Sequence, residues 1–310
     1  MASIEFNHKT VLLNEAVDVM SIRPDGIYVD GTTGGAGHSK LIAGKLTTGR
    51  LISIDKDPDA IAVAKERLSG FACSTVVQAD FSEFDSVLDS LGIDKVDGVV
   101  LDLGVSSPQL DRAERGFSYH NDAPLDMRMS QQGMSARDLV NTYDAAALTR
   151  ILYEYADEKF APRIANAIVK ARGISPIETT LQLAEIVSNA VPAAARRDGH
   201  PARKTFQAIR IAVNGELDCL STFLDKALDR LNKGGVISII SFHSLEDRMV
   251  KHRFAEWCQG CTCPKELPIC VCGKTPRAKL ITRKAIEPSE EQIDLNFRVR
   301  SAKLRAVVKL

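Results

Sequence analysis

The segment from Gly26 to His38, GIYVDGTTGGAGH, constrains the fold more than any other part of this chain. An apolar run over 27–29 ends at Asp30, and four glycines follow within the next seven residues. A helical pattern then begins at Ser39. A buried strand, a glycine-rich turn and a helix form the first unit of a nucleotide-binding α/β sheet.

The glycines have a physical reason to be there. Glycine adopts positive φ angles without strain and lets a ligand approach the backbone, because it has no Cβ. The backbone amides at the start of the following helix point into the gap. The spacing G-x-x-G-G-x-G nevertheless differs from the dinucleotide fingerprint G-x-G-x-x-G. A glycine-rich loop that binds nothing is therefore the alternative interpretation.

Length and composition define the broad class of protein. With 310 residues, 45% hydrophobic and 26% charged, the chain resembles an ordinary globular protein of one large domain or two small ones. The first ten residues, MASIEFNHKT, contain no apolar signal-peptide region, and no run approaches the roughly 18 apolar residues of a membrane span. We therefore expect a cytoplasmic protein with no membrane partner.

The formal net charge is zero, so any affinity for nucleic acid must come from local basic patches. Residues 196–210 contain five Lys/Arg against one Asp, and residues 273–284 contain five basic residues and no acid. Residues 298–309 likewise contain five basic residues and no acid. Each run can also be a solvated face without a partner.

Two further strands are predicted after the opening unit. The first covers 50–54 and ends at Asp55, and a helix with Asp57-Pro58 at its start follows. A carboxylate at this strand end is the usual partner of ribose hydroxyls, although Asp55 can also be a turn residue. The next strand covers 74–77 and leads to Phe81, which can pack on an adenine ring or belong to the core.

A fourth strand over 96–101 leads into Asp102. Residues just beyond the carboxyl ends of central parallel strands face the ligand, so Asp102 is the best-placed catalytic carboxylate in the chain. A fifth strand over 236–240 precedes His243, which we interpret either as a structural histidine or as a substrate contact. We expect Ser244 to cap the next helix, with Asp247 at the capping-box position. A last strand covers 304–310.

The alternation of strands and helices stops between 110 and 213, where no convincing strand is found. Instead, a polar loop precedes helices predicted over 143–156, 161–172 and 180–190, and the basic segment closes the region. A helix over 216–231 and a turn over 232–235 then restart the α/β pattern. The predicted domains are an α/β domain of residues 1–109 and 214–310 and a helical insertion of residues 110–213.

Five of the seven cysteines fall between Cys258 and Cys272. Clustered thiols in a cytoplasmic protein suggest a metal before a disulfide. Four of them can in principle surround one zinc ion, although C-x-C pairs are less specific than C-x-x-C pairs. These four are Cys261, Cys263, Cys270 and Cys272.

Several motifs occur in a characteristic order along the chain: DGTTGGAGHS, DLGVSSPQLD, RGFSY, PLDMRM, HPARKTFQAIRIAVNGEL and SFHSLEDR. In this respect the sequence closely resembles the MraW family of bacterial ribosomal RNA (cytosine-N4)-methyltransferases. The resemblance implies a Rossmann-like class I methyltransferase sheet with an inserted helical, RNA-recognising domain. It also implies transfer of a methyl group from S-adenosylmethionine to a cytosine in the decoding region of small-subunit ribosomal RNA.

The resemblance also implies a set of site residues. The cofactor contacts transfer to Ala36, Gly37, His38, Asp55, Phe81, Asp102 and Gln109. We assign Asp102 the catalytic role of accepting the N–H of the cytosine amine. Phosphate contacts are expected from Arg196, Arg197, Arg203 and Lys204. The loop departs from the family pattern at Ala36, where relatives often carry a further glycine.

Two other classes of protein share part of this pattern. A nicotinamide-dependent dehydrogenase has the same strand, glycine loop and Asp55, but the glycine spacing is wrong for it. A non-catalytic ribosome-assembly factor would share the basic segments and the cysteines, but it would not need a donor pocket. Cofactor titration separates the first alternative, and label transfer to RNA separates the second.

Overall fold

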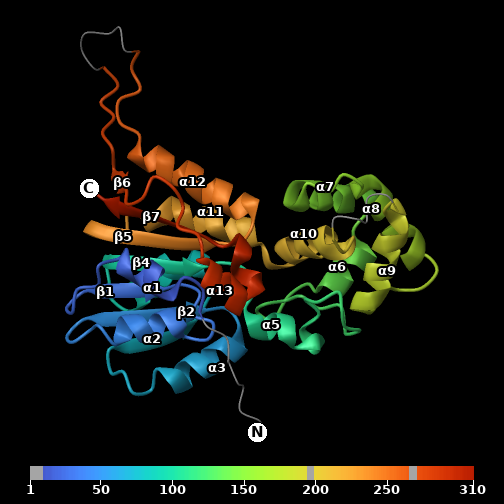
Figure 1. Cartoon of the computed structure of the whole chain (residues 1–310), viewed down its shortest axis with the longest axis horizontal. Coiled ribbons are helices and arrows are strands. Elements are labelled where there is room, and N and C mark those ends of the chain that lie inside the picture. The colour runs from blue at the N-terminus through green and yellow to red at the C-terminus, as the bar shows by residue number, and fades with distance from the viewer. Residues whose placement is uncertain (1–9, 194–198, 265–270) are drawn as a thin grey trace. The chain divides into compact units, whose positions relative to one another are not determined.

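The computed structural model describes residues 10–193, 199–264 and 271–310. It divides into two compact units. A helical unit covers Val105–Glu216, and the α/β unit comprises the chain up to Gly104 and from Leu217 onward (Figure 1). The helical unit is slightly wider than the 110–213 expected from the sequence. Gln109, which we had placed in the α/β domain, belongs to it.

In the described part of the chain, seven strands form one sheet with the order β3-β2-β1-β4-β5-β7-β6. The first five are parallel, as expected for a doubly wound α/β sheet, whereas β7 runs antiparallel to both β5 and β6. Every predicted strand is present. The strands are β1 (Ile27–Asp30), β2 (Arg50–Asp55), β3 (Ser74–Gln78), β4 (Val96–Asp102), β5 (Leu231–Ser241), β6 (Ala278–Leu280) and β7 (Lys303–Lys309).

Both faces of the sheet are buried, because successive residues of its central strands enter two different cores. Val29 of β1 is buried beside Ile52, its partner on β2, in a core that also contains Phe223 and Phe254. Tyr28, one residue earlier, points to the opposite core. Near-continuous apolar strands are the sequence pattern of this arrangement.

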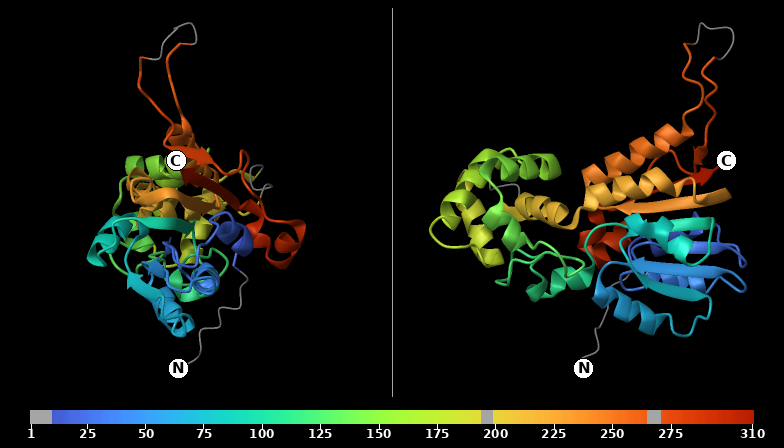
Figure 2. Two further views of the ribbon diagram at one scale, coloured as in Figure 1. Left: turned by 90° about the vertical axis from the view of Figure 1, so that its left-hand side faces the viewer. Right: turned by 180° about the vertical axis from the view of Figure 1, so that it is seen from behind.

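Helices cover each face, and the two layers can be followed in Figure 2. One core receives side chains from α4, α11 and α12, and the other from α1 and α2. The helices of this part are α1 (Leu13–Asp18), α2 (Gly37–Ala43), α3 (Pro58–Arg67), α4 (Phe84–Ser90), α11 (Glu216–Ala227), α12 (Ser244–Cys258) and α13 (Glu290–Leu295), with 3₁₀ turns η1 (Phe81–Glu83) and η4 (Phe297–Ser301). The predicted start of α3 is confirmed, because Asp57 caps it and accepts the amide of Asp59.

The expected helix over 216–231 and turn over 232–235 are wrong in detail. Helix α11 ends at Ala227, and β5 already begins at Leu231. Leu231 pairs with Val96, and the register shifts before Gly98 pairs with Val236. The Gly-Gly pair thus lies inside the strand, where Gly234 has a φ of 81°. Pairing with β4 on both sides overrides the local preference for a turn.

The helical unit contains α5 (Ser107–Asp111), η2 (Ala113–Arg115), α6 (Ala136–Thr142), α7 (Ala145–Ala156), α8 (Ala161–Arg172), α9 (Thr180–Ala190) and α10 (Ala202–Asn214). The bounds of α8 and α9 match the prediction. Helix α7 begins after Asp144 rather than at 143, because that side chain accepts the amide of Ala147 as the N-cap. Its described residues form no strand, only an isolated bridge between Pro124 and Thr179.

Much of the basic segment is helical. Residues 202–214 form α10, which buries Phe206 and Ile209 in the core of the helical unit. None of the helices in the described ranges combines the length and the apolar character that crossing a membrane demands.

Candidate functional site

The end of β1 is tied to the helix that follows it through one buried carboxyl group. Asp30 is 1% exposed and accepts the Ser39 hydroxyl at 2.6 Å and the Thr32 amide at 3.3 Å. The Ser39 hydroxyl also lies 2.8 Å from that of Ser53 on β2. Burial raises the pKa of Asp30 to about 6. These contacts fix the loop between strand and helix.

The glycine loop is built by both conformation and close packing. Gly34 has a φ of 49° and Ala36 a φ of 60°, in the left-handed region. A Cβ on Gly31 would lie 2.4 Å from Cδ2 of Leu101, so any larger residue would force that side chain to move. Ala36 is buried and adopts a left-handed conformation that costs a non-glycine residue about 1–2 kcal/mol.

Asp55 ties this loop to the end of β2. Its Oδ2 accepts the Gly34 amide at 2.7 Å, and its Oδ1 accepts the Asp57 amide at 2.9 Å. Burial is the main cause that raises the pKa of Asp55 to about 6. Each carboxylate oxygen has a second lone pair, so both can still accept a hydroxyl of a ligand.

Asp102, at the end of β4, has an amide that donates to the Thr32 hydroxyl at 2.6 Å. Its side chain is 22% exposed, but Oδ1 is buried and has no hydrogen-bond partner among the described residues. Burial raises the pKa of Asp102 well above its ordinary value, and the negative charges of Asp30 and Glu246 raise it further.

His38 lies at the start of α2 and faces this carboxyl group. Its Nδ1 is 3.9 Å from Oδ2 of Asp102, which is too long for a hydrogen bond. Its Nε2 is buried and, in the described ranges, also has no hydrogen-bond partner. Burial lowers the pKa of His38 to about 4, so the imidazole is neutral at pH 7 and the two groups are not an ion pair.

These two buried polar atoms test whether the edge of the sheet fits a ligand. Leaving a buried polar atom unpaired costs about 1–3 kcal/mol, so such atoms are rare without a reason. Asp102 holds one at the carboxyl end of β4, and His38 holds the other in the first turn of α2, the helix that follows the neighbouring strand β1. Nucleotide ligands bind at this edge in this kind of sheet. With Asp55 nearby on β2, the chemistry fits a polar ligand that carries a ribose.

Phe81 is buried against another aromatic ring of the core. It is 9% exposed and packs edge-on against Phe223, with ring centroids 6.0 Å apart. Its neighbour Asp80 forms an ion pair with Lys56 at 3.0 Å, which lowers the pKa of Asp80 against the effect of its own burial. The contact of Phe81 with an adenine ring stays a prediction.

Gln109 has a clear local role in the helical unit. It lies in the first turn of α5, where its side chain accepts the Ser106 amide at 2.9 Å and its own amide donates to the Ser106 hydroxyl. This reciprocal capping box begins the helix. Its role as a cofactor contact stays a prediction.

His243, not Ser244, caps α12, and the capping-box partner is Glu246 rather than Asp247. The histidine Nδ1 accepts the Glu246 amide, while the buried Glu246 carboxylate accepts the Phe242 amide at 2.8 Å. The prediction was wrong by one residue because an imidazole nitrogen can replace a hydroxyl as the cap acceptor. Asp247 instead binds Arg305 of β7 through two hydrogen bonds.

Sequence reasoning missed an aromatic cluster in the helical unit. Tyr119 stacks on His200 with ring centroids 4.6 Å apart and planes 19° from parallel. It also contacts His120 at 4.4 Å and the edge of the buried Phe206 at 5.5 Å. Both imidazoles are exposed. The two histidines are 80 positions apart, so only the fold reveals that they share one surface.

The basic residues predicted to contact phosphate differ in their surroundings. Arg203 is exposed on the first turn of α10, close in sequence to His200. Lys204 donates to the carbonyl of Asp157, at the end of α7, at 3.0 Å. Its charge therefore also stabilises a helix terminus. Arg196 and Arg197 lie outside the described residues.

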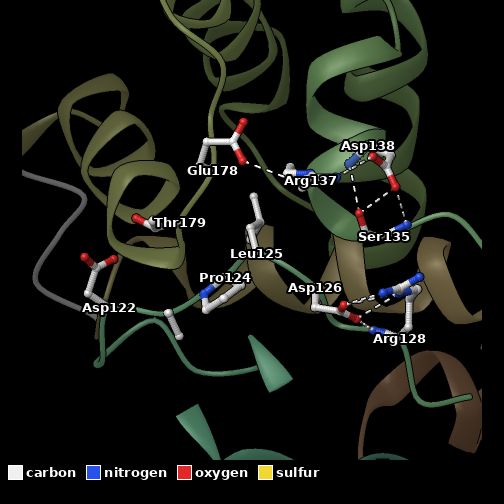
Figure 3. A pocket seen from close by; sticks show the side chains of 11 residues that line it. Asp122, Pro124, Leu125, Asp126, Arg128, Ser135, Arg137, Asp138, Glu178 and Thr179 are labelled. Atoms are coloured by element: carbon white, nitrogen blue, oxygen red, sulfur yellow. Dashed lines mark hydrogen bonds and ion pairs between the residues drawn. The ribbon is translucent and has the colours of Figure 1, made fainter. Parts of the chain in front are cut away.

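The helical unit also contains an open pocket of about 630 Å³ (Figure 3). Both of its arginines are paired with carboxylates of the lining: Arg128 binds Asp126 at 2.6 Å, and Arg137 approaches Glu178 at 3.4 Å. Carboxylates outnumber guanidinium groups in its lining, so the pocket does not fit a phosphate. The lining residues are Asp122, Ala123, Pro124, Leu125, Asp126, Arg128, Ser135, Arg137, Asp138, Glu178 and Thr179.

The sheet order, the antiparallel β7 and the acids at the strand ends define a Rossmann-like class I methyltransferase, which uses S-adenosylmethionine. The chain belongs to the MraW methylase family, whose model matches residues 5–310. The predicted fold class, family and cofactor are thereby confirmed.

Similar proteins are known from several bacteria. The ribosomal RNA small subunit methyltransferase H of Clostridium botulinum (strain Kyoto / Type A2) is 54% identical over 309 residues, which cover 99% of this chain and 100% of that protein. The protein of the same name from Brevibacillus brevis (strain 47) is 53% identical, with 100% of both chains covered. A solved rRNA methylase from Streptococcus thermophilus matches 97% of this chain and 98% of its own, with 11% identity and a TM-score of 0.44.

Proposed function

We propose that this protein transfers a methyl group from S-adenosylmethionine to the exocyclic N4 amine of a cytosine in the decoding region of small-subunit ribosomal RNA. Membership of a methylase family and the names of its relatives support RNA of the small subunit as the substrate. The observation that carries the chemistry is the buried, unpartnered Oδ1 of Asp102, within the described residues, at the end of a central strand.

The amine of cytosine is a weak nucleophile, because its lone pair is delocalised into the ring. Burial raises the pKa of Asp102, so its carboxyl group has to be ionised by the positive charge of the bound donor before it can act as a base. The carboxylate then accepts a hydrogen bond from that N–H and takes up the proton as the N–C bond forms and the sulfur–methyl bond of the donor breaks. The sulfonium of the methyl donor supplies an electrophilic carbon, so the protein mainly has to align the reactants and exclude water. The neutral His38 adds no competing positive charge beside the acceptor.

The donor is held by residues of the α/β unit. Asp55 retains one free lone pair on each oxygen for the ribose hydroxyls, while its other contacts fix the glycine loop. The loop residues Ala36 and Gly37 offer backbone groups, and His38 offers its unpaired Nε2. Phe81 is the proposed neighbour of the adenine ring in this unit. Gln109, which belongs to the helical unit, is proposed separately as a cofactor contact on the family resemblance alone.

The RNA contacts are proposed for the helical unit. Exposed aromatic and imidazole rings stack on unpaired bases, and nearby arginines bind the phosphates between them. Tyr119 and His200 already stack on each other, and Arg203 is exposed one turn away. Because a target base must leave its stack before it reaches a catalytic carboxylate, such a surface suits single-stranded or loop RNA.

Mass spectrometry of nucleosides tests the proposal. Small-subunit RNA or isolated subunits are incubated with the protein and a donor that carries a deuterated methyl group, and the digest is compared with N4-methylcytidine and 5-methylcytidine standards. Label on N4 supports the proposal, whereas label on carbon 5 or on another nucleoside contradicts it. An Asp102→Asn variant that still binds the donor is the matched control for transfer by this site.

The alternatives separate in the same assay. Membership of a methylase family removes the nicotinamide-dependent dehydrogenase from consideration. A non-catalytic assembly factor would bind RNA without transferring label under any condition. If neither free RNA nor isolated subunits acquire label although the protein binds the donor, the non-catalytic assembly factor is favoured.

A further inference from the structure

The described residues between α12 and β6 form no regular secondary structure. They are two arms, residues 259–264 and 271–277, that run side by side away from the sheet (Figure 1). Most of their residues are exposed, and the side chain of Val271 is 78% exposed. At the base, the Arg277 amide donates to the Trp257 carbonyl at 2.8 Å. A segment of this kind buries too little apolar surface to order itself.

Further out, the two arms are joined through sulfur. The Thr262 amide of the first arm donates to Sγ of Cys272 on the second at 3.5 Å. In the reverse direction, the Val271 amide donates to Sγ of Cys263 at 3.4 Å. Within the first arm, the Cys263 amide donates to Sγ of Cys261 at 3.4 Å. Each of these sulfurs accepts a backbone amide, which favours the thiolate over the thiol.

The three sulfur atoms also have the spacing of a metal site. They all lie within 4.8 Å of one another, and Sγ of Cys272 is 3.7 Å from Sγ of Cys261. Zinc–sulfur bonds of about 2.3 Å at tetrahedral angles place two ligand sulfurs about 3.8 Å apart. A disulfide would place them about 2.05 Å apart. The observed separation is that of an S–H···S hydrogen bond, and it is also the separation that two ligands of one zinc ion require.

We propose that Cys261, Cys263 and Cys272 bind one zinc ion, which ties the two arms together. Zinc is favoured because three thiolates form a soft donor set, and zinc needs no redox partner. Three thiol protons are released as three zinc–sulfur bonds form, which leaves a local net charge of −1. Cys270, grouped with these cysteines in the sequence analysis, lies outside the described residues and forms no part of the proposed site.

The site would order a basic surface. Residues 273–284 follow Cys272 directly and carry five basic side chains without an acid. Because most described residues of the second arm are exposed, the metal is what would keep Lys274 and its neighbours at fixed positions. Free energy of metal binding becomes free energy of local folding in segments of this kind.

Metal analysis of the full-length protein tests the proposal without reference to methyl transfer. The protein is purified with a reductant, saturated with zinc and freed of excess metal by gel filtration, and the retained zinc is quantified. We expect one equivalent for the wild type and loss of most of it in Cys261→Ser and Cys272→Ser. Cys73→Ser is the matched control and should retain the metal, because Cys73 packs against the core that α1 and α2 cover.

Cobalt gives a second, independent readout. Co²⁺ bound by several thiolates shows sulfur-to-metal charge-transfer bands and the intense visible bands of tetrahedral coordination, which zinc then displaces. Proteolysis within 259–277 should be slower with zinc than with a chelator. Wild-type protein that retains no zinc and shows no such bands would overturn the proposal, as would a Cys261–Cys272 disulfide in protein isolated without an oxidant.

Discussion

His38 and Asp102 face each other with Nδ1 and Oδ2 3.9 Å apart, yet they form neither a hydrogen bond nor an ion pair. Each keeps one buried polar atom without a partner in the part of the chain that the structure describes. Burial acts on the two groups in opposite directions, lowering the pKa of His38 and raising that of Asp102, and thus favours the neutral form of both. We therefore expect this site to bind a charged ligand that forms hydrogen bonds with the two unpaired atoms.

Replacing Asp102 by Asn or Ala should reduce turnover far more than donor affinity. Both variants lack the carboxylate that takes up the amine proton, and losing general base catalysis removes a contribution of about 10²–10⁴-fold to the rate of transfer. The Asn amide oxygen can still accept the N–H, so Asn should lose less than Ala. Single-turnover kinetics and donor titration measure the two effects separately. Asp294→Asn, an exposed acid on α13, is the control. An equal loss of affinity and rate would reduce Asp102 to a cofactor contact.

Donor binding should become weaker as the pH falls through about 6. Asp55 has a pKa of about 6 in the free protein, and a ligand of net positive charge favours its ionised form, so binding releases protons. Calorimetry near pH 6 in buffers of different ionisation enthalpy measures that release, which should decrease in Asp55→Asn. S-adenosylhomocysteine, which lacks the sulfonium charge, should release fewer protons. Equal proton release by both ligands would contradict the argument.

The stability of Asp30→Asn relative to the wild type should increase as the pH rises. Because the pKa of Asp30 is raised from 3.8 to about 6, the Asp30 carboxyl group is protonated in the folded protein but ionised in the unfolded chain between about pH 3.8 and about pH 6. The free energy of unfolding of the wild type therefore decreases as the pH rises through that window. The Asn variant has no titrating group at this position, so it does not lose this stability. The relative gain reaches up to about 3 kcal/mol. Urea unfolding at pH values near 4 and 7 measures it, and a difference that is independent of pH would refute it.

Tyr119→Ala should weaken RNA binding by about 1–3 kcal/mol if the ring stacks on a base. Tyr119→Phe retains the ring and should bind almost normally, which separates stacking from a role of the hydroxyl. Fluorescence anisotropy with a single-stranded fragment measures affinity, and circular dichroism checks that the helix content of the whole protein is unchanged. Wild-type affinity in the alanine variant would exclude this surface from the interface.

Arg203→Glu should flatten the dependence of RNA affinity on salt concentration, because one phosphate contact is lost. Lys204→Glu should do so as well, but it should also destabilise the fold, because Lys204 binds the carbonyl at the end of α7. Binding measured across a salt series and thermal unfolding distinguish the two variants. An unchanged slope in Arg203→Glu would mean that this arginine contacts no phosphate.

Local patterns in the sequence were sufficient for much of the fold. The buried strands and their terminal acids, the glycine loop and helices such as α8 and α9 all follow from apolar periodicity and capping chemistry. One failure occurred where strand pairing overrode a local preference for a turn, and the other where two neighbouring side chains could both act as the helix cap. The Gly-Gly segment around Gly234 lies inside β5 because β4 pairs with it on both sides, and His243 takes the capping position because Glu246 completes its capping box.

The sequence by itself determined the order of the elements and the family, since both depend on residues close together along the chain. Only the tertiary structure decided that His38 and Asp102 face each other, that Tyr119 stacks on His200, and that three cysteine sulfurs converge. The physical reason is that burial, and the pKa values and unpaired atoms it produces, depend on neighbours from distant parts of the chain.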